Sequence, residues 1–236
     1  MEILRTFGFN QFAIDLSVRD PNHKEKYLGD DATWAMAESS LVSALKRAGL
    51  DYHRAEGEAT FYGPKIDIKL FDSLGRQWQC PTIQFDFNEP GRFSIYYMGV
   101  DGGHHQPLMV HRTILGALER FFGILIEHYA GAFPVWLSPD QAIVLTVSDQ
   151  QIAYGESILK LLREHQVRVT SNFANEKINY KIAEAERNKI PYMIIIGKRE
   201  EANKTISLRK KQKGDLGSMT IENVINQIED DVRARR

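Results

Sequence analysis

The sequence has little of what marks a secreted, membrane-bound or strongly basic protein. Cys80 is the single cysteine among 236 residues, which excludes an internal disulfide and suits a reducing cytoplasm. No apolar run reaches the roughly 18–20 residues that cross a bilayer, and the first residues show no signal-peptide pattern. The net charge is −1, so any nucleic-acid site must be local. We expect a cytoplasmic protein without a membrane partner.

Residue patterns divide the chain into two domains, 1–137 and 138–236, with the boundary in a proline-containing segment at 134–139. The first domain has alternating polar and apolar segments that are joined by short turns rich in Gly, Asp and Pro. Such segments predict an antiparallel sheet, here with strands at 61–71, 76–87 and 92–100. With the helices described next, this domain is expected to be of the α+β class.

Residues 32–48 predict a helix of the first domain, with Asp30 or Asp31 as its N-cap. In the second domain, strand-like and helix-like segments alternate, which favours βαβ units around a mainly parallel or mixed sheet. The second domain is therefore expected to be of the α/β class. Its strands are expected at 142–148, 167–173, 192–197 and 204–211, and its helices at 150–165, 176–188 and 219–232.

A long apolar segment at 109–129 predicts a helix that packs on the first sheet. Gly116 and Arg120 would share one side of it, four residues apart. A glycine inside a helix lowers helix stability by about 1 kcal/mol relative to alanine, so its presence there needs a structural or functional explanation. Either a flat ligand lies against Gly116 with Arg120 beside it, or the helix packs closely there and Arg120 makes a surface ion pair. The helix alone favours packing, with a core face of Leu115, Leu118, Phe122, Leu125 and Ile126.

The bend at Gly63–Pro64 places two polar side chains at a fixed turn. Tyr62 offers a hydroxyl and Lys65 an ammonium, which together could contact a small polar substrate or a phosphate. An ordinary β-turn with an exposed lysine would have the same sequence, so the turn alone decides nothing.

Strand alternation gives the segment at 76–87 one polar face with Thr82, Gln84 and Asp86, while Gln79 falls on the other face. Three polar side chains in a row on a central strand need partners, and a ligand is one kind of partner. Solvent is the other, and the sequence does not decide between them.

His111 would open the predicted helix at 109–129. A lone histidine beside an apolar run is more often structural than a metal ligand, because a metal site needs three or four ligands and none is near in sequence. In the second domain, the dense basic segment at 204–213 suits contacts with a phosphate backbone, or it is a solvated run of charge.

Several long segments, taken in order, resemble the C-terminal half of the class II threonyl-tRNA synthetases. They are FYGPKIDI, WQCPTIQFDF, MVHRTILGALERFFGILIEHYAGAFPVWLSP, NEKINYKI and GDLGSM. The resemblance implies a partial class II catalytic core with an antiparallel sheet at 1–137 and an α/β anticodon-binding domain with a mixed sheet at 138–236. Gly116 to Arg120 would be the third signature motif of the class, G-x-x-x-R.

The resemblance also implies an activity. Members of this family activate threonine with ATP and Mg²⁺ to threonyl-adenylate and transfer it to the 3′ end of tRNA(Thr). They act as homodimers and hold a zinc ion with three protein ligands, one of them corresponding to His111. The zinc binds the threonine amino and hydroxyl groups, so that valine, which lacks the hydroxyl, is refused.

By the same resemblance, individual residues take roles. Arg120 would stack on the adenine and reach the γ-phosphate, and Gly116 would allow close approach. Tyr62 would contact the threonine amino group, with Lys65 near the reacting groups. The adenylate pocket would be lined by Gln79, Thr82 and Gln84, and the anticodon would be contacted by Asn175, Glu200 and Arg209.

The sequence departs from the family pattern in several ways. The first two signature motifs and the other two zinc ligands are expected upstream of Met1, and Cys80 is not one of those ligands. Ala183 stands where many bacterial relatives carry an arginine, and Gly214 is displaced by one residue. The chain is therefore expected to be a poorly active fragment of the ligase, or alternatively an inert tRNA-binding remnant or partner subunit. A prolyl-tRNA synthetase is disfavoured by FYGPKID and MVHRTILG.

Overall fold

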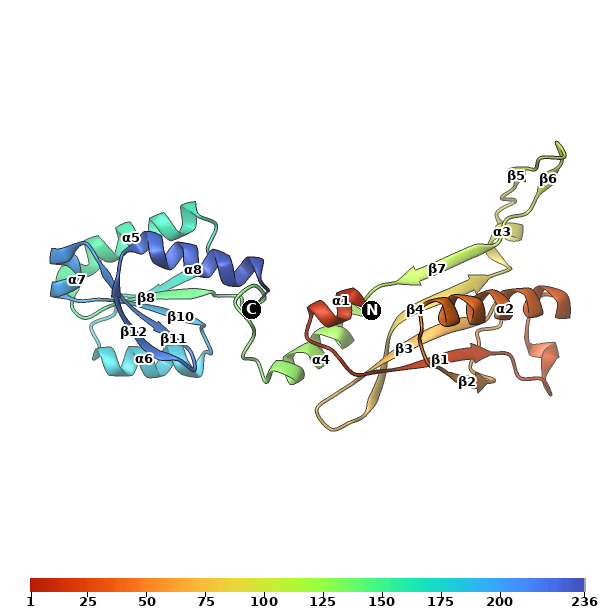
Figure 1. The fold of residues 1–236 in the computed structure, drawn as a ribbon, viewed down its shortest axis with the longest axis horizontal. Helices are drawn as coiled ribbons and strands as arrows, with labels where there is room; N and C mark the ends of the chain where they lie inside the picture. The colour runs from red at the N-terminus through yellow and green to blue at the C-terminus, as the bar shows by residue number, and fades with distance from the viewer. Residues whose placement is uncertain (236) are drawn as a thin grey trace. The chain divides into compact units, whose positions relative to one another are not determined.

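The computed structural model describes residues 1–235, which form two compact units, 1–128 and 129–235 (Figure 1). Each unit has its own sheet and helices. The domain boundary that the sequence suggests, between residues 137 and 138, stays a prediction. Each unit is described by itself below.

The first unit is built on a five-stranded sheet of order β2-β1-β3-β4-β7. Strands β1, β3, β4 and β7 pair antiparallel, as predicted, whereas β2 pairs parallel with β1. The strands are β1 (Phe12–Val18), β2 (His53–Glu56), β3 (Lys65–Phe71), β4 (Gln77–Asp86) and β7 (Met109–Thr113). The helices are α1 (Glu2–Thr6), α2 (Asp31–Arg47), α3 (Glu89–Arg92) and α4 (Leu118–Tyr129), with a 3-10 turn η1 (Lys24–Lys26).

Helix α2 confirms the sequence expectation. Its N-cap is Asp30, whose carboxylate accepts a hydrogen bond of 2.7 Å from the Thr33 N–H and so satisfies a donor that the helix leaves unpaired. The buried residues of the helix recur at helical spacing: Trp34, Ala37, Leu41 and Leu45. This apolar stripe covers one face of the sheet and leaves the other face to polar side chains.

The register of the sheet brings polar side chains of separate strands together on that second face. On β1, Asp15 and Ser17 alternate with the buried Ile14 and Leu16. Asp15 lies opposite Asp67 of β3, and the register continues across β3 to Thr82 and Gln84 of β4. The sheet therefore has one apolar and one polar face.

The predicted helix at 109–129 is wrong in its first half. Residues Met109–Thr113 form β7, which pairs with β4, and the helix begins only at Leu118. Gly116 lies in the connection with φ of +76°, where a Cβ would stand 2.4 Å from the Cys80 carbonyl oxygen. Pairing with β4 thus overrides the apolar periodicity, and the glycine serves a backbone turn rather than a helix interior.

The core face predicted for α4 is also largely wrong. Leu125 is buried as expected, together with Phe121 and Ile124, but Leu118, Phe122 and Ile126 are exposed. The strand predicted at 92–100 is mostly absent too. Residues 89–92 form α3, and only β5 (Tyr97–Met98) pairs, with β6 (His104–His105), in a short hairpin.

The second unit has a mixed sheet of order β12-β11-β10-β8-β9, as predicted. Strands β8, β9 and β10 run parallel, and β11 and β12 join them antiparallel. The strands are β8 (Ala142–Thr146), β9 (Val169–Asn172), β10 (Tyr192–Ile196), β11 (Ile206–Lys210) and β12 (Gly214–Met219). The helices are α5 (Ile152–Glu164), α6 (Ile178–Arg187), α7 (Lys198–Asn203) and α8 (Ile221–Arg233), with a 3-10 turn η2 (Asp149–Gln151).

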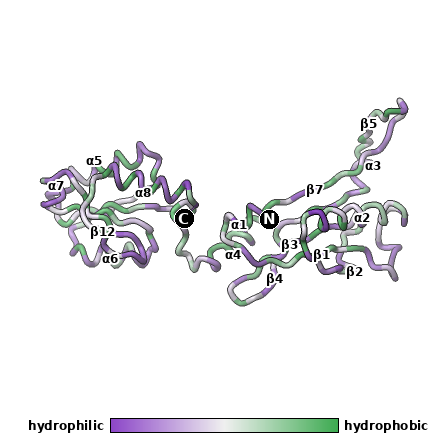
Figure 2. Tube along the Cα trace, in the orientation of Figure 1, coloured by the Kyte–Doolittle hydropathy of each residue, from purple (hydrophilic) through white to green (hydrophobic). Residues whose placement is uncertain are grey.

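Helices α5 and α8 cover one face of this sheet and α6 covers the other (Figure 1). Ile158 of α5 and Ile228 of α8 share a core with Val144, whereas Ala185 of α6 packs with Leu145 on the opposite side. Hydrophilic and hydrophobic residues alternate along these helices (Figure 2), as expected for helices with one buried face. Neither α7 nor β12 was among the elements predicted from the sequence.

Replacing Gly116 by alanine should destabilise the first unit by about 1–3 kcal/mol, because alanine is strained at positive φ and its Cβ would meet the Cys80 backbone. Gly123 is the matched control, since it lies inside α4 with nothing within 4 Å of its added Cβ. Alanine there should stabilise by about 0.5–1 kcal/mol. Urea unfolding of both variants measures the difference, and an unchanged Gly116→Ala variant would contradict the assigned turn.

Candidate functional site

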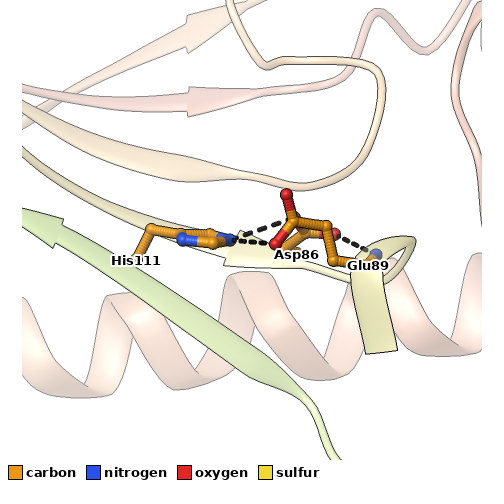
Figure 3. Close-up of side chains that lie close together, drawn as sticks. All are labelled: Asp86, Glu89 and His111. Carbon is orange, nitrogen blue, oxygen red and sulfur yellow. Dashed lines mark hydrogen bonds and ion pairs between the residues drawn. The ribbon is translucent and has the colours of Figure 1, made fainter. Parts of the chain in front are cut away.

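The end of β4 and the middle of β7 bring three possible metal ligands together (Figure 3). His111 lies opposite Gln84 in the ladder, so Asp86 is its diagonal neighbour on the same face. The Nε2 atom of His111 is 3.0 Å from Asp86 Oδ2 and 3.6 Å from Glu89 Oε2. The expectation that His111 opens a helix is wrong, because His111 lies within β7. As expected, no further possible ligand is near it in sequence, but the fold brings Asp86 and Glu89 beside it.

Asp86 is held in place by the turn that follows it. Its Oδ1 atom accepts hydrogen bonds from the N–H groups of Asn88 and Glu89, at 2.7 and 3.0 Å. Burial would raise the pKa of Asp86, but these backbone donors and His111 outweigh it and hold that pKa below its ordinary value. The carboxylate is therefore ionised at neutral pH, with Oδ2 directed toward the imidazole.

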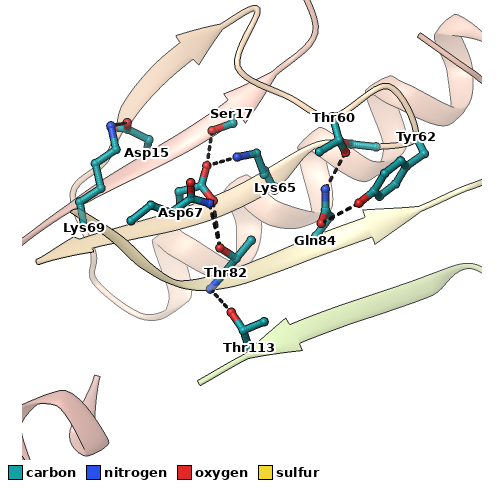
Figure 4. Close-up of polar contacts among 12 residues, drawn as sticks. Asp15, Ser17, Thr60, Tyr62, Lys65, Asp67, Lys69, Thr82, Gln84 and Thr113 are labelled. Carbon is teal, nitrogen blue, oxygen red and sulfur yellow. Dashed lines mark hydrogen bonds and ion pairs between the residues drawn. The ribbon is translucent and has the colours of Figure 1, made fainter. Parts of the chain in front are cut away.

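Further along the polar face, Asp67 is the centre of a hydrogen-bond network that sequence reasoning missed (Figure 4). Its side chain is 5% exposed, and its carboxylate accepts from Lys65 Nζ at 2.6 Å. It also accepts from the Ser17 hydroxyl at 2.8 Å and the Thr82 hydroxyl at 3.1 Å, and from Gln79 Nε2. Alternation within β3 was the available signal, since it places Asp67 beside Lys65 and Lys69 on one face.

Gln79 reaches this network because β4 has a bulge. Asp67 pairs with Thr82 but Lys69 pairs with Gln79, so two steps along β3 match three along β4. The extra residue moves Gln79 to the face of Thr82, whose hydroxyl it contacts at 3.1 Å. Simple alternation had assigned Gln79 to the opposite face, and that expectation is wrong. Pro81 was the signal, because a proline within a central strand indicates a bulge.

Tyr62 is fixed against β4 by the glycine that follows it. A Cβ on Gly63 would lie 2.1 Å from the Phe85 carbonyl oxygen, so only glycine allows this approach. The Tyr62 hydroxyl is 3.4 Å from Gln84 Oε1, and Gln84 Nε2 donates to the Thr60 hydroxyl at 2.6 Å. The structure thus brings Tyr62 and Gln84 together.

Arg120 is exposed in the first turn of α4, and its side chain contacts β4. Its Nη1 donates to the Gln79 carbonyl oxygen at 2.7 Å, and its guanidinium lies 5.9 Å from the Trp78 ring centroid. Gly116 contacts β4 one residue further on, at Cys80. The two residues do not share a helix face as expected, but both adjoin one end of β4.

The second unit separates its three predicted anticodon residues. Asn175 is exposed in the loop after β9, and Glu200 lies in α7, which follows β10. Both follow the carboxyl ends of parallel strands, where α/β sheets bind ligands. Glu200 accepts from the Gly197 N–H at 2.9 Å and so caps its own helix. Arg209 pairs with Met193 near the other end of β10 and lies 3.9 Å from Glu186.

Two lysines of the second unit, one of them in the basic segment at 204–213, have side chains that point inward. Lys181 is 1% exposed, and its Nζ donates to the Thr146 carbonyl oxygen at 2.9 Å. Burial lowers the pKa of Lys181, although the negative charge of Glu176 opposes this. Lys210 pairs with Asp231 and lies 4.9 Å from the Tyr192 ring centroid. The cationic surface is therefore smaller than the sequence suggests.

Comparison with known families matches both units. Residues 1–129 match the tRNA synthetase class II core domain (G, H, P, S and T), and residues 141–231 match the anticodon binding domain. The chain is 50% identical over 223 residues to the threonine–tRNA ligase of Acidobacterium capsulatum, covering 94% of this chain and 33% of that protein. It is also 50% identical over 224 residues to the ligase of Caldanaerobacter subterraneus subsp. tengcongensis, covering 95% and 34%. The chain thus spans about a third of the length of these relatives.

Solved structures agree. The RNA binding domain of threonyl-tRNA synthetase from Cryptosporidium parvum superposes with a TM-score of 0.89 at 36% identity, over 97% of this chain and 57% of that one. A putative threonyl-tRNA synthetase from Aeropyrum pernix superposes with a TM-score of 0.78 at 29% identity, over 99% of this chain and 58% of that one. Prolyl-tRNA synthetase from Giardia lamblia shares only the fold, with a TM-score of 0.57 at 16% identity over 74% of this chain and 40% of that one. Within residues 1–235, no helix is long and apolar enough to cross a membrane.

Asp67→Ala should destabilise the first unit by about 3 kcal/mol, because it leaves the Lys65 ammonium, 12% exposed, without its carboxylate. The matched control is Asp15→Ala on the same face. Its partner Lys69 is 30% exposed, so water can solvate the Lys69 ammonium once the carboxylate is removed. That variant should lose about 1 kcal/mol or less. Equal losses in urea unfolding would contradict the central position of Asp67.

Proposed function

Because this chain belongs to the threonyl-tRNA synthetases of class II, we propose that it is the part of a threonine–tRNA ligase that contacts the adenylate and the anticodon. The proposed reaction of the whole enzyme joins threonine to ATP, releases pyrophosphate, and transfers the threonyl group to the 3′ end of tRNA(Thr). The observation that carries the proposal is the polar face of β4. Along this face lie Gln79, Thr82 and Gln84, with Arg120 near one end of the strand and His111 near the other.

The chemistry proposed for this face is positioning and charge stabilisation. Arg120 offers a planar, exposed guanidinium beside β4, suited to stack on adenine and to bind a phosphate of ATP with its Mg²⁺. Gly116 lets the backbone approach closely there. Lys65 would neutralise charge near the reacting groups, while the adenylate would be held by hydrogen bonds from Gln79, Thr82 and Gln84.

Threonine would be bound beside Gln84. Tyr62 lies 3.4 Å from Gln84 and presents a hydroxyl that can accept from the threonine amino group. His111 would supply one ligand of a zinc ion, which when bound orients the amino and hydroxyl groups of threonine. Its imidazole on β7 stands within reach of the same polar face, so the donor set suits such an ion.

We propose that the second unit binds tRNA(Thr) at the anticodon, with Asn175 and Glu200 contributing from the carboxyl edge of the sheet. Arg209 would act from a separate position, and Ala183, which is exposed on α6, offers no charge. Homodimer formation and a cytoplasmic location belong to the same proposal. An inert tRNA-binding subunit is the second candidate, because the anticodon-binding domain is matched over 141–231 whereas the chain spans about a third of its relatives.

The chain alone should show weak threonine-dependent ATP–pyrophosphate exchange, since it spans about a third of the length of the ligases that it matches. Arg120→Ala should abolish the residual rate, because the guanidinium is needed to bind ATP. Arg112→Ala is the control, being an exposed arginine on β7 beside the apolar face. Robust exchange by the chain alone would contradict the expected weak activity, and exchange driven better by proline would contradict the assignment to threonine.

Asn175→Ala should weaken binding of tRNA with a threonine anticodon about tenfold in a gel-shift titration, the usual effect of losing one base contact of about 1–3 kcal/mol. Asn223→Ala, an exposed asparagine on α8, is the matched control and should leave affinity unchanged. Equal affinity of the unmodified chain for tRNAs with and without a threonine anticodon would argue against specific recognition.

A further inference from the structure

Trp78 connects the Arg120 guanidinium to the turn between β3 and β4. The guanidinium carbon lies 5.9 Å from the centroid of the Trp78 ring, and Nη1 donates to the Gln79 carbonyl oxygen at 2.7 Å. At such a distance the quadrupole of an indole ring attracts a cation. Arg120 is exposed to solvent, so these two contacts decide where its guanidinium is held.

The indole ring is fixed in turn by Asp72. Trp78 Nε1 donates to Asp72 Oδ2 at 2.8 Å, and the Asp72 side chain is 1% exposed. The same carboxylate accepts from the N–H groups of Leu74 and Arg76, each at 2.9 Å, and from Arg76 Nε at 2.6 Å. Burial raises the pKa of Asp72, but these donors outweigh it and hold that pKa well below its ordinary range. The indole N–H therefore meets an ionised carboxylate that the turn keeps in place.

The ring and the guanidinium meet at the edge of β4. Strand β7 pairs with β4 over residues 82–86, so the Gln79 carbonyl lies beyond that ladder and is open to Arg120. Trp78 lies opposite the buried Leu70 and belongs to the apolar face, whereas the Gln79 side chain belongs to the polar face. Trp78 therefore contacts Arg120 from the apolar side of the sheet and leaves the polar side to the proposed ATP.

We infer that Trp78, held by Asp72, positions the Arg120 guanidinium for ATP. An arginine side chain loses rotamer freedom when it binds a ligand, and a guanidinium that is already held loses less. Both are positioning residues, because Trp78 acts through Arg120 and Asp72 acts through Trp78. The inference rests on the proposed function, in which Arg120 contacts ATP.

The test is a double-mutant cycle on the ATP affinity of the full chain, measured by equilibrium dialysis with radiolabelled ATP and Mg²⁺. Trp78→Leu should weaken ATP binding about two- to fivefold, the range expected for one cation–π contact at an exposed site. Adding Trp78→Leu to Arg120→Ala should cause no further loss, because the ring acts only through the guanidinium. A purely structural role for Trp78 would instead give losses that add. Asp72→Asn should weaken ATP binding no more than Trp78→Leu does, and should add nothing to it.

Ser73→Ala is the matched control. The Ser73 hydroxyl donates to Glu127 Oε2 of α4 at 3.2 Å, so it joins the same turn to the same helix by a link that does not run through Trp78. This variant should bind ATP like the unaltered chain, and urea unfolding checks that every variant folds. Without ATP, the indole N–H resonance of Trp78 should shift in the NMR spectrum of Arg120→Ala and stay in place in that of Ser73→Ala.

Failure of the inference can be told from failure of the proposed function. The inference alone is overturned if Arg120→Ala weakens ATP binding but Trp78→Leu does not, if the two losses add, or if the indole resonance does not respond to Arg120→Ala. An unaltered chain that binds no ATP, or an Arg120→Ala variant that binds it undiminished, would contradict the proposed role of Arg120 and the inference with it.

Discussion

The close approach of two loops to the backbone of β4 is the constraint on which the first unit depends. Gly63 and Gly116 each bring a chain segment to within a distance of β4 that no Cβ would allow. One glycine positions Tyr62 beside Gln84, and the other starts the turn that leads to Arg120. Because both segments rest on one strand, side chains far apart in sequence meet along a single line of the sheet.

Charge balance on the polar face follows from the strand register. The ladder places Asp67 next to Lys65, and it places Asp15 where Lys69 can reach it. Each buried or half-buried carboxylate is thereby paired within the sheet, which is the condition for burying an ionised group. The cluster at Asp86 departs from this pattern, because the charged or polar groups next to its carboxylate are the imidazole of His111 and a second carboxylate, Glu89, which lies beside the same imidazole.

The second unit uses its lysines in two ways. Lys181 and Lys210 make contacts within the domain: Lys181 donates to the Thr146 carbonyl oxygen, and Lys210 forms an ion pair with Asp231. Lys177, Lys204 and Lys213 are exposed, and Asn175 and Glu200 follow the carboxyl ends of the parallel strands. A basic segment in a sequence therefore overstates the charge that is free to meet a nucleic acid.

Local pattern sufficed for the capped helix α2, for the mixed sheet of the second unit, and for the family, whose long segments survive in order. Alternation also found Thr82 and Gln84 on one strand face. Only the tertiary structure decided the face of Gln79, the strand at 109–113, the carboxylates around His111 and the burial of Lys181. The physical reason is that each of these depends on which strand pairs with which and at what register, and pairing between segments distant in sequence leaves no periodic trace in either one.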